Sequence, residues 1–549
     1  MEDLWYKNAV FYGVDVESFQ DSNGDGVGDF QGLIDRLDYL NDLGVTCLWI
    51  LPFYATPNRD NGYDVKDYLS VDARLGKLND FTALVEAARE RNIRILVDLI
   101  VHHTSDEHPW FQAAVADASS KFRNFYIWTD EKPEQSKHKN IFVGEESGVW
   151  EYEKKAGAYY HHLFYNFMPD LNVANPEVQE EIESIIEFWL AFGIHGFRID
   201  AATHLLENKG VKGTMIHEPA AFLKRLRKWV TKKDKNNILL GEADLEPEKL
   251  KPYFGNGDRM NMLFNFVLDN YMFLAFATEE AKPVFDWLNK PMPPNKCQWA
   301  NFLRNLDELD LERLTDKERK QVYDTFAPDP NMRIFNRGIR RRLAPMLQNN
   351  RKRLEMANSL LFSMPGAPVI MYGDEIGMGD NLDLPGRVSV RTPMQWNDGR
   401  NAGFSDAPAK KLVRQPISKG AFSYKKVNVN SQAGSDKSFL SWMKLLIRMR
   451  MQCKEIGNGK IKPLAASMPQ VLVHSFEWNN SILVCMHNFC AEACRFSFKS
   501  NRFEIRHLHD IFSDSNYQPT SEKQTDLELN GYGYRWFRVH KPELTHAPI

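Results

Sequence analysis

The sequence predicts an α/β protein: a (β/α)8 TIM barrel with a domain inserted after strand 3 and an antiparallel β domain at the C-terminus. Short apolar runs alternate with longer segments of helical periodicity over about 450 residues, which is typical of parallel strands joined by helices. Eight such strand-and-helix units can be counted. After them the apolar spacing changes to period two, so residues 466–549 are expected to form a β-sandwich. An open doubly wound sheet is the alternative arrangement of the same units.

The strands are expected where short apolar runs occur, such as TCLWIL and IRILVDLI. They cover residues 9–16, 46–51, 93–100, 196–199, 237–241, 262–266, 299–303 and 368–371. Helices are expected where apolar residues recur every three or four positions. They cover residues 33–43, 80–91, 178–192, 218–231 and 354–363.

Two stretches interrupt this alternation and set the domain boundaries. Residues 103–172 are rich in aromatic and polar side chains and show no clear helix, so we assign them to an inserted domain. The barrel then comprises 1–102 and 173–465. Residues 307–353 are highly charged and are expected to form a helical excursion within the barrel. Three consecutive arginines at 340–342 are expected on a solvated face.

Composition and charge exclude several classes of protein. The chain has 549 residues, of which 43% are hydrophobic and 26% charged, the balance of a globular protein. A net charge of −4 offers no attraction for nucleic acid. The sequence has no apolar run long enough to span a membrane, and its first residues lack the pattern of a signal peptide. Six cysteines are too few for a disulfide framework, so we expect a cytoplasmic protein with reduced thiols.

Charged residues follow several predicted strands at the point where each strand ends. In a TIM barrel these ends meet at one mouth, where active sites lie. The residues are Asp98, Arg198, Asp200, Glu242, Arg304 and Asp307. Each acid alone could cap a helix or pair with an arginine. Together, four acids and two arginines at one mouth indicate a functional site.

Three acids around one cavity suggest glycoside chemistry. One carboxylate attacks the anomeric carbon, and a second, kept protonated, donates to the leaving oxygen. Arg198 is close to Asp200 in the sequence and is expected to keep it ionised as the nucleophile. Glu242 has no neighbouring cation in the sequence, which favours an acid of raised pKa.

The segments around these residues resemble glycoside hydrolase family 13, the α-amylase family. They read DLIVHHTSDEHPWF (98–111), GFRIDAATHL (196–205), LLGEAD (239–244) and FLRNLDELDLERLTD (302–316). Longer fragments, including LPFYATPNRDNGYDVKDY and APDPNMRIFNRGIRRRLAPML, are similar to the trehalose synthases of that family, which interconvert maltose and trehalose. The resemblance covers nearly the whole chain. It implies a retaining enzyme that acts on a disaccharide or small oligosaccharide.

The resemblance implies a role for each residue that matches a family motif. Asp200 would be the nucleophile that carries a covalent glucosyl group, and Glu242 would be the acid/base. Asp307 would be the third acid, which grips sugar hydroxyls. Other residues would contact the glucose being transferred, namely Asp60, Tyr63, His103, Arg198 and Arg391.

Two positions depart from the family pattern. His102 stands where the family usually has asparagine, and Leu306 stands where it usually has a histidine that contacts secondary hydroxyls of the reacting glucose. Leucine cannot make that hydrogen bond, whose loss costs about 1–3 kcal/mol. We therefore expect slower turnover of ordinary glucosides, or a pocket suited to a different sugar, with His102 and Leu306 both at the substrate.

A loop near the N-terminus has the oxygen ligands of a calcium site. Its residues match positions 1, 3, 5, 7 and 9 of an EF-hand loop, the seventh through its carbonyl: Asp21, Asn23, Asp25, Val27 and Asp29. Gly26 takes position 6, but position 12 is Gly32 in place of the usual glutamate. Similar family members place Ca²⁺ or Mg²⁺ here, so we expect a structural ion. The alternative is a metal-free turn.

A second group of metal-binding residue types lies near the C-terminus. His487, Cys490 and Cys494 are close enough in sequence to imitate a zinc site. Their segment alternates like a pair of strands, which favours strands over a metal site.

Three functions remain open. The first is intramolecular glucosyl transfer of the trehalose-synthase type, which requires water to be excluded while the freed glucose turns, with residues 307–353 as the closing arm. The second is an α-glucosidase, in which water takes the glucosyl group. The third is a non-catalytic relative used for binding, which the presence of Asp200, Glu242 and Asp307 disfavours. The expected partner is a small sugar, with no nucleic acid and no membrane.

Overall fold

The eight predicted strands close into a parallel barrel in the computed structural model of the chain, which describes residues 4–131, 140–521 and 525–539. The strands follow one another around the barrel in chain order. They are β1 (Phe11–Val14), β2 (Cys47–Ile50), β5 (Arg94–Leu99), β9 (Gly196–Ile199), β10 (Ile238–Gly241), β11 (Met262–Phe264), β12 (Gln298–Asn301) and β16 (Ala367–Met371). The predicted (β/α)8 barrel is confirmed.

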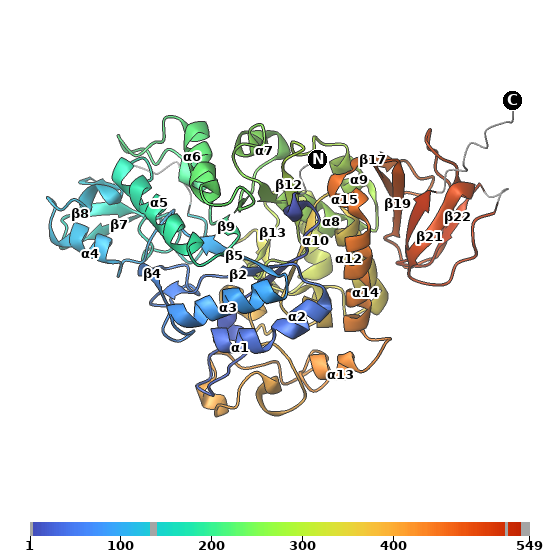
Figure 1. Ribbon diagram of the computed structural model, residues 1–549, viewed down its shortest axis with the longest axis horizontal. Helices are drawn as coiled ribbons and strands as arrows, with labels where there is room; N and C mark the ends of the chain where they lie inside the picture. Colours follow the sequence, from blue (N-terminus) through green and yellow to red (C-terminus); the bar gives the residue numbers. More distant parts are fainter. Residues whose placement is uncertain (1–3, 132–139, 522–524, 540–549) are drawn as a thin grey trace.

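Helices cover the outside of the barrel (Figure 1). They include α3 (Leu78–Glu90), α5 (Pro176–Leu190), α6 (Pro219–Thr231), α7 (Pro247–Phe254), α8 (Phe266–Thr278), α9 (Lys282–Leu288), α12 (Arg351–Ser363) and α14 (Phe439–Gln452). The short helices α13 (Val429–Ala433) and α15 (Lys454–Asn458) pack against α14. The helix predicted over 33–43 is two helices, α1 (Phe30–Asp35) and α2 (Leu37–Leu43), which meet at Arg36. Asp29 caps α1 by accepting the N–H of Gly32 at 2.7 Å.

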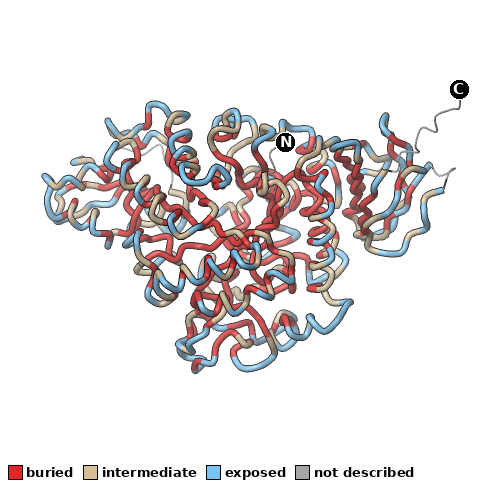
Figure 2. Tube along the Cα trace, in the orientation of Figure 1, coloured by how far each residue is buried: buried red, intermediate tan, exposed pale blue. Residues whose placement is uncertain are grey.

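The barrel strands are buried because helices cover their outer face and side chains fill the interior. The buried part of the trace is concentrated in the middle of the molecule (Figure 2). Strands β9 and β10, for example, are buried at every residue. Of the helices in the described part of the chain, none combines the length and apolar character needed to cross a bilayer.

The stretch 103–172 leaves the barrel after β5 and forms the inserted domain, at the left of Figure 1. Its strands, in sheet order β6-β8-β7, are β6 (Trp128–Thr129), β7 (Trp150–Glu153) and β8 (Ala158–His161). The expectation of no clear helix here is wrong, because α4 spans Pro109–Ala116. Its start is defined by proline at the first helical position and by His108, whose ring accepts the N–H of Trp110 at 3.1 Å.

The stretch 307–353, which we call the arm, is only partly helical. It contains α10 (Asp316–Phe326) and α11 (Leu343–Met346), but also a small sheet of β13 (Leu309–Asp310), β15 (Gly338–Ile339) and β14 (Arg333–Ile334). The expectation that the arginines at 340–342 form a solvated face is also wrong. Arg342 is 2% exposed and donates to the carbonyls of Val390 and Tyr372 at 2.9 and 2.8 Å, because these backbone groups need donors inside the fold.

An antiparallel β domain follows the barrel, as predicted, and its first strand begins at residue 460. Its strands are β17 (Lys460–Leu464), β18 (Val471–Trp478), β19 (Ser481–Asn488), β20 (Cys494–Phe496), β21 (Leu508–Ser513), β22 (Leu527–Leu529) and β23 (Tyr534–Val539). A five-stranded sheet in the order β17-β18-β19-β23-β21 and the pair β20-β22 share one apolar core that includes Val484, Phe496 and Phe537.

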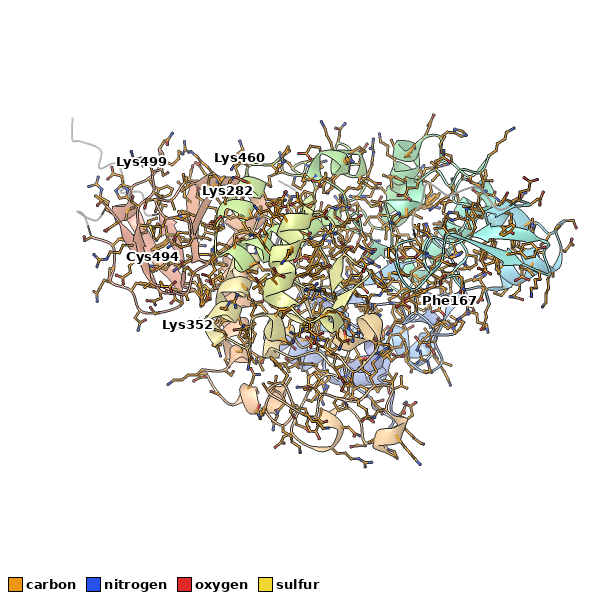
Figure 3. All side chains as sticks on the ribbon, turned by 180° about the vertical axis from the view of Figure 1, so that it is seen from behind. Phe167, Lys282, Lys352, Lys460, Cys494 and Lys499 are labelled. Atoms are coloured by element: carbon orange, nitrogen blue, oxygen red, sulfur yellow. The ribbon has the colours of Figure 1, made fainter. Side chains whose placement is uncertain are left out.

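The residues that could imitate a zinc site lie in different surroundings. His487 is fully buried in β19, whereas Cys494 lies in β20 at the outer side of the domain (Figure 3). Within the described ranges, the group that brings three possible His, Cys, Asp or Glu ligand atoms within 4.8 Å is elsewhere, at Asp244, Asp310 and Glu312. The strand interpretation of this segment therefore holds.

Two buried histidines join the β domain to the barrel. The ring of His487 lies 3.0 Å from the hydroxyl of Ser359 in α12, and His474 donates from Nε2 to the carbonyl of Ser363 at 3.0 Å. The two imidazoles stack at 6.0 Å. Burial lowers the pKa of His474 to about 4 and that of His487 well below its usual value. Both rings are therefore neutral at neutral pH, and protonating either opposes this interface.

We expect acid to destabilise the protein through His474. The unfolded histidine titrates near pH 6.5, so below that pH the unfolded state gains a proton that the folded state does not bind until about pH 4. Between these values the free energy of unfolding should fall by roughly 3 kcal/mol for this group. His474→Gln, which keeps a donor for Ser363 and does not titrate, should flatten that slope in denaturant titrations. The matched change of exposed His217 to Gln should leave it unaltered, and an equal slope in all three proteins would contradict the assignment.

Candidate active site

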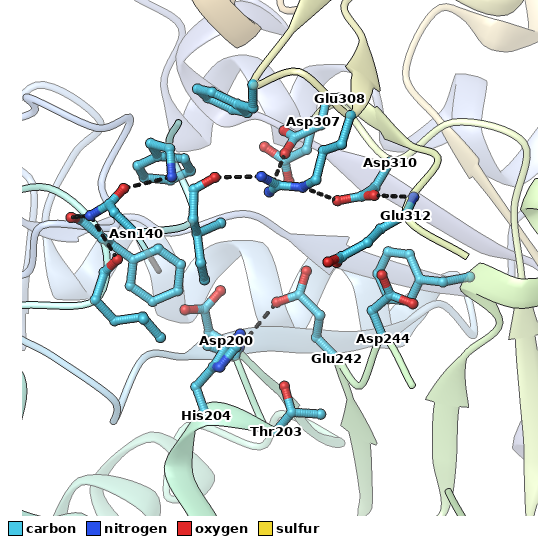
Figure 4. A pocket seen from close by; sticks show the side chains of 18 of the residues that line it. Asn140, Asp200, Thr203, His204, Glu242, Asp244, Asp307, Glu308, Asp310 and Glu312 are labelled. Carbon is cyan, nitrogen blue, oxygen red and sulfur yellow. Dashed lines mark hydrogen bonds and ion pairs between the residues drawn. The ribbon is translucent and has the colours of Figure 1, made fainter. Parts of the chain in front are cut away.

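Four of the six strand-end residues, Arg198, Asp200, Glu242 and Asp307, line one cavity of about 720 Å³ at the C-terminal mouth of the barrel (Figure 4). The other two, Asp98 and Arg304, are buried and do not line it. Asp200 follows β9, Glu242 follows β10, and Asp307 lies on the loop after β12. The inserted domain and the arm supply the rest of the wall. A cavity of this size can hold a disaccharide.

Arg198 links three carboxylates at the base of the cavity. Its Nη1 lies 2.6 Å from Asp98 and 2.7 Å from Asp200, and its Nη2 lies 2.9 Å from Glu242 Oε2. The backbone N–H of Ala201 also donates to Glu242 Oε2, at 3.0 Å. Because both contacts fall on Oε2, Oε1 is the oxygen that remains for a leaving group. Glu242 thus has a cationic partner, contrary to the expectation from sequence spacing.

A single guanidinium cannot neutralise three carboxylates, so one of the three acids around Arg198 is expected to keep its proton. Burial raises the pKa of Glu242, and the charge of Asp200 raises it further, while Arg198 opposes the shift. Burial likewise raises the pKa of Asp98, to about 7. Burial also raises the pKa of Asp200, and it outweighs Arg198, which lowers that pKa as the sequence suggested. Glu242 is the acid of the three with the exposed side chain, at 26%, and can pass its proton to a ligand.

Asp307 lies between two arginines. Arg391 Nη2 and Arg387 Nη1 lie 2.5 and 2.9 Å from its Oδ1. Burial alone would raise the pKa of Asp307, but these two guanidinium groups lower it below its usual value. Asp307 is therefore held as a carboxylate, which can only accept hydrogen bonds.

Most of the predicted substrate-binding residues lie on the cavity wall. These are Asp60, Tyr63, His103 and Arg198. Arg391 lies behind Asp307, to which it donates. His102 lies behind His103, with the two Nδ1 atoms 3.3 Å apart. Leu306 is 2% exposed, belongs to the main apolar core and has a φ of 67°, so its side chain packs inside the loop rather than on the wall.

Sequence reasoning missed a central residue of the site, Arg387. Its guanidinium joins Asp60, at 3.2 Å, to Asp307, at 2.9 Å, and lies 5.0 Å from the ring of Phe142. It also missed acids of the far wall, which are labelled in Figure 4, Asp244, Glu308, Asp310 and Glu312. Arg387 belongs to a short loop helix and the far-wall acids to the arm and a strand-end loop, so a search restricted to the residue that ends each strand does not find most of them.

The inserted domain and the arm meet over the mouth. The ring of Phe142 lies 4.8 Å from that of Phe335, and Arg337 donates to the carbonyl of Ile141. On its arm side Arg337 also binds Asp310, with Nε 2.6 Å from Oδ2. These contacts join the inserted domain to the arm at the wall of the cavity, which Arg387 also lines.

The oxygen-rich loop at Asp21–Asp29 lies away from this cavity. Asp21 Oδ1 accepts the N–H of Gly24 at 2.7 Å, and Asp29 Oδ2 accepts the hydroxyl of Ser22 at 2.9 Å. Asp21 and Asp29 are buried, whereas Asn23 and Asp25 are exposed. The side chains of the loop offer oxygen, the ligand type that Ca²⁺ and Mg²⁺ prefer. The oxygens of Asp21 and Asp29 accept hydrogen bonds from the loop itself.

Comparison with known protein families shows which family the chain belongs to. Residues 14–459 match the model of the α-amylase catalytic domain. The chain belongs to the α-amylase family. Its residues 480–538 match a second model, the C-terminal domain of sucrose hydrolase-like proteins. Asp200, Glu242 and Asp307 all lie within the matched range.

Relatives in the α-amylase family are similar over the full length. The trehalose synthase of Pimelobacter sp. strain R48 is 39% identical over 562 residues, which cover 100% of this chain and 98% of that protein. The trehalose synthase/amylase of Mycolicibacterium smegmatis is 39% identical over 98% of this chain and 93% of its own. Among solved structures, the trehalulose synthase MutB from Pseudomonas mesoacidophila MX-45 superposes with a TM-score of 0.76 at 25% identity, over 98% of this chain and 99% of that one.

Proposed function

We propose that the protein converts maltose into trehalose by intramolecular glucosyl transfer. The observation that carries the proposal is the bridge over the cavity wall, in which Phe142 of the inserted domain meets Phe335 of the arm at 4.8 Å. Isomerisation requires the freed glucose to stay in the cavity while water is excluded. The full-length similarity to trehalose synthases supports the same reaction.

The first half of the reaction transfers glucose to the enzyme. A carboxylate oxygen of Asp200 attacks C1 of the non-reducing glucose, and the bond from C1 to O4 of the second glucose breaks. Glu242 gives its proton to that O4 as it leaves. Asp307, kept ionised by Arg387 and Arg391, accepts hydrogen bonds from hydroxyls of the transferred glucose. The product is a glucosyl ester on Asp200 with free glucose beside it.

The second half returns the glucosyl group to the trapped sugar. The freed glucose turns so that its anomeric hydroxyl faces C1 of the ester. Glu242, now a carboxylate, removes the hydroxyl proton, the oxygen attacks C1, and Asp200 leaves. Two inversions retain the α configuration and give the α,α-1,1 linkage of trehalose. A water molecule in the same place would give two glucose molecules instead.

The proposal is tested by incubating the protein with maltose and following the anomeric protons by NMR. We expect trehalose as the main product, with little free glucose, and the reverse conversion from trehalose. Glucose alone would show an α-glucosidase. No change in maltose, trehalose, sucrose or an aryl α-glucoside would show a non-catalytic relative. The Asp200→Asn protein, purified in parallel, controls for contaminating activity.

The loop Asp21–Asp29 is proposed to bind one divalent ion, Ca²⁺ or Mg²⁺, that stabilises the fold. Side-chain oxygens of Asp21, Asn23, Asp25 and Asp29 and the carbonyl of Val27 would hold it. An ion bound only to the native state stabilises that state by mass action. A chelator should therefore lower the melting temperature by roughly 2–5 °C, and Ca²⁺ should restore it.

Two variants make the metal experiment specific. Asp25→Ala should abolish the response to chelator, whereas the matched change of exposed Asp436 to Ala, outside the loop, should preserve it. If the melting curve of the wild-type protein responds to neither chelator nor Ca²⁺, the metal-free turn is the correct description of this loop.

A further inference from the structure

A buried set of polar groups lies directly behind His103, outside the catalytic machinery described above. His102 Nε2 is 3.1 Å from Lys209 Nζ, and His102 Nδ1 is 3.3 Å from His103 Nδ1 and 3.5 Å from Asp170 Oδ1. The side chains of His102, Lys209 and Asp170 are 2, 4 and 0% exposed. The set thus joins the barrel, the inserted domain and the loop after β9.

The direction of each hydrogen bond in this set follows from the groups at its ends. A lysine ammonium only donates, so His102 must accept on Nε2 and carry its proton on Nδ1. That proton faces His103 Nδ1, which must accept it, and the carboxylate of Asp170. The proton of His103 is then on Nε2, 3.2 Å from the backbone carbonyl of Tyr63. A carbonyl can only accept, so the Tyr63 carbonyl independently requires the proton of His103 to be on Nε2.

We propose that His102 is a positioning residue that, held by Lys209 and Asp170, orients His103 and fixes it as a hydrogen-bond donor at Nε2. His103 lies on the cavity wall beside Phe164, and its one proton, directed at the carbonyl of Tyr63, is the proton that a sugar hydroxyl at this wall would share. The inference rests on the proposed function only in taking the ligand of this wall to be a glucoside. The proposal gives His102, which stands where the family usually has asparagine, a role that needs no contact with the substrate.

The surroundings also set the charge of His103. The charged and titratable groups around the two rings are Asp170 and Lys209, His204 on the loop after β9, and Asp60 and Asp64 on the loop that bears Tyr63. Burial lowers the pKa of both histidines, while the nearby carboxylates oppose the shift. The bond donated by His102 occupies the lone pair that a proton would take. Removing that donor therefore raises the pKa of His103.

Two variants at position 102 separate positioning from packing. His102→Gln keeps an oxygen that accepts from Lys209 and an amide N–H that donates to His103. His102→Leu, of similar volume, keeps neither. On an aryl α-glucoside we expect His102→Leu to lower kcat/KM about tenfold and to move the acid limb of its pH profile to higher pH. His102→Gln should keep the wild-type limb. The same limb in both variants and the wild type would overturn the proposal.

A measurement independent of turnover completes the test. In protein labelled with ¹⁵N at histidine, the resonances of the two rings report which nitrogen bears the proton, with assignments from His102→Gln and His103→Gln. We expect Nδ1–H for His102 and Nε2–H for His103 in the wild type, and loss of the ordered His103 signal in His102→Leu. A proton on Nδ1 of His103 would overturn the proposal even if the protein turned over no sugar. Failure to make trehalose from maltose, with the expected resonances, would instead count against the proposed function alone.

Discussion

Asp200→Asn should lower kcat on α-glucosides by at least about 10⁴-fold while the protein stays folded. The amide has the shape of the carboxylate but is too weak a nucleophile to form the glucosyl ester. The change leaves the other partners of Arg198 in place, since that arginine still binds Asp98 and Glu242. The measurements are kcat on maltose and on an aryl α-glucoside, together with the melting temperature.

The matched control is Asp98→Asn. Asp98 binds the same Nη1 of Arg198, at 2.6 Å compared with 2.7 Å for Asp200, but it is fully buried and does not line the cavity. We expect it to cost far less activity than Asp200→Asn, because it removes an ion-pair partner and not the nucleophile. Wild-type rates in Asp200→Asn, or equal losses in the two variants, would refute the assignment. A fluorinated α-glucosyl fluoride should add mass to the wild-type peptide that contains Asp200.

The sequence contained enough information for the barrel because each strand has a local signal. Segments such as Thr46–Leu51 are short, apolar and flanked by helical periodicity, and burial on both faces of a parallel strand requires that composition. The small elements of the insertion and the arm escaped prediction. Strands of two residues such as β13 and β14 have no measurable period, and α4 spans only eight residues.

The strand-end rule located the acids but not their partners. Asp200 and Glu242 stand at strand ends, where the chain direction alone brings them to one mouth. Arg387 reaches Asp60 and Asp307 across separations of 327 and 80 residues, and only the folded loops bring them together. Glu242 likewise has no cation near it in the sequence, but the fold brings Arg198 of the neighbouring strand to 2.9 Å from its carboxylate.

Departures from a family motif were read from the sequence as changes at the substrate, and the structure places them one layer back. His102 lies behind His103, and Leu306 packs into the core of its loop, where its carbonyl accepts from Arg391 at 2.9 Å. Residue identity at a motif position does not define which way the side chain points. The backbone conformation defines that direction, and at Leu306 the backbone has a φ of 67°, which no sequence pattern predicts.

Glu242→Gln should separate substrates by their need for a proton. The glutamine cannot donate to a leaving oxygen, so turnover of maltose or trehalose should fall about 10²- to 10⁴-fold. α-Glucosyl fluoride leaves without protonation, and the first step with this substrate should be nearly as fast as in the wild-type protein. The amide matches the carboxyl in shape and can keep its contact with the N–H of Ala201, so the cavity should remain intact.

Two further readouts follow from the raised pKa of Glu242, which burial produces and Asp200 reinforces. Wild-type turnover of disaccharides should decline as pH rises through that pKa, because the acid loses its proton, and the first step with α-glucosyl fluoride should lack this decline in Glu242→Gln. The glucosyl ester should then accumulate, since no carboxylate activates the acceptor. Azide, a nucleophile that needs no base, should release it as glucosyl azide. Equal losses on fluoride and disaccharide, with no response to azide, would show that Glu242 is not the acid/base and that the proton comes from another group around Arg198.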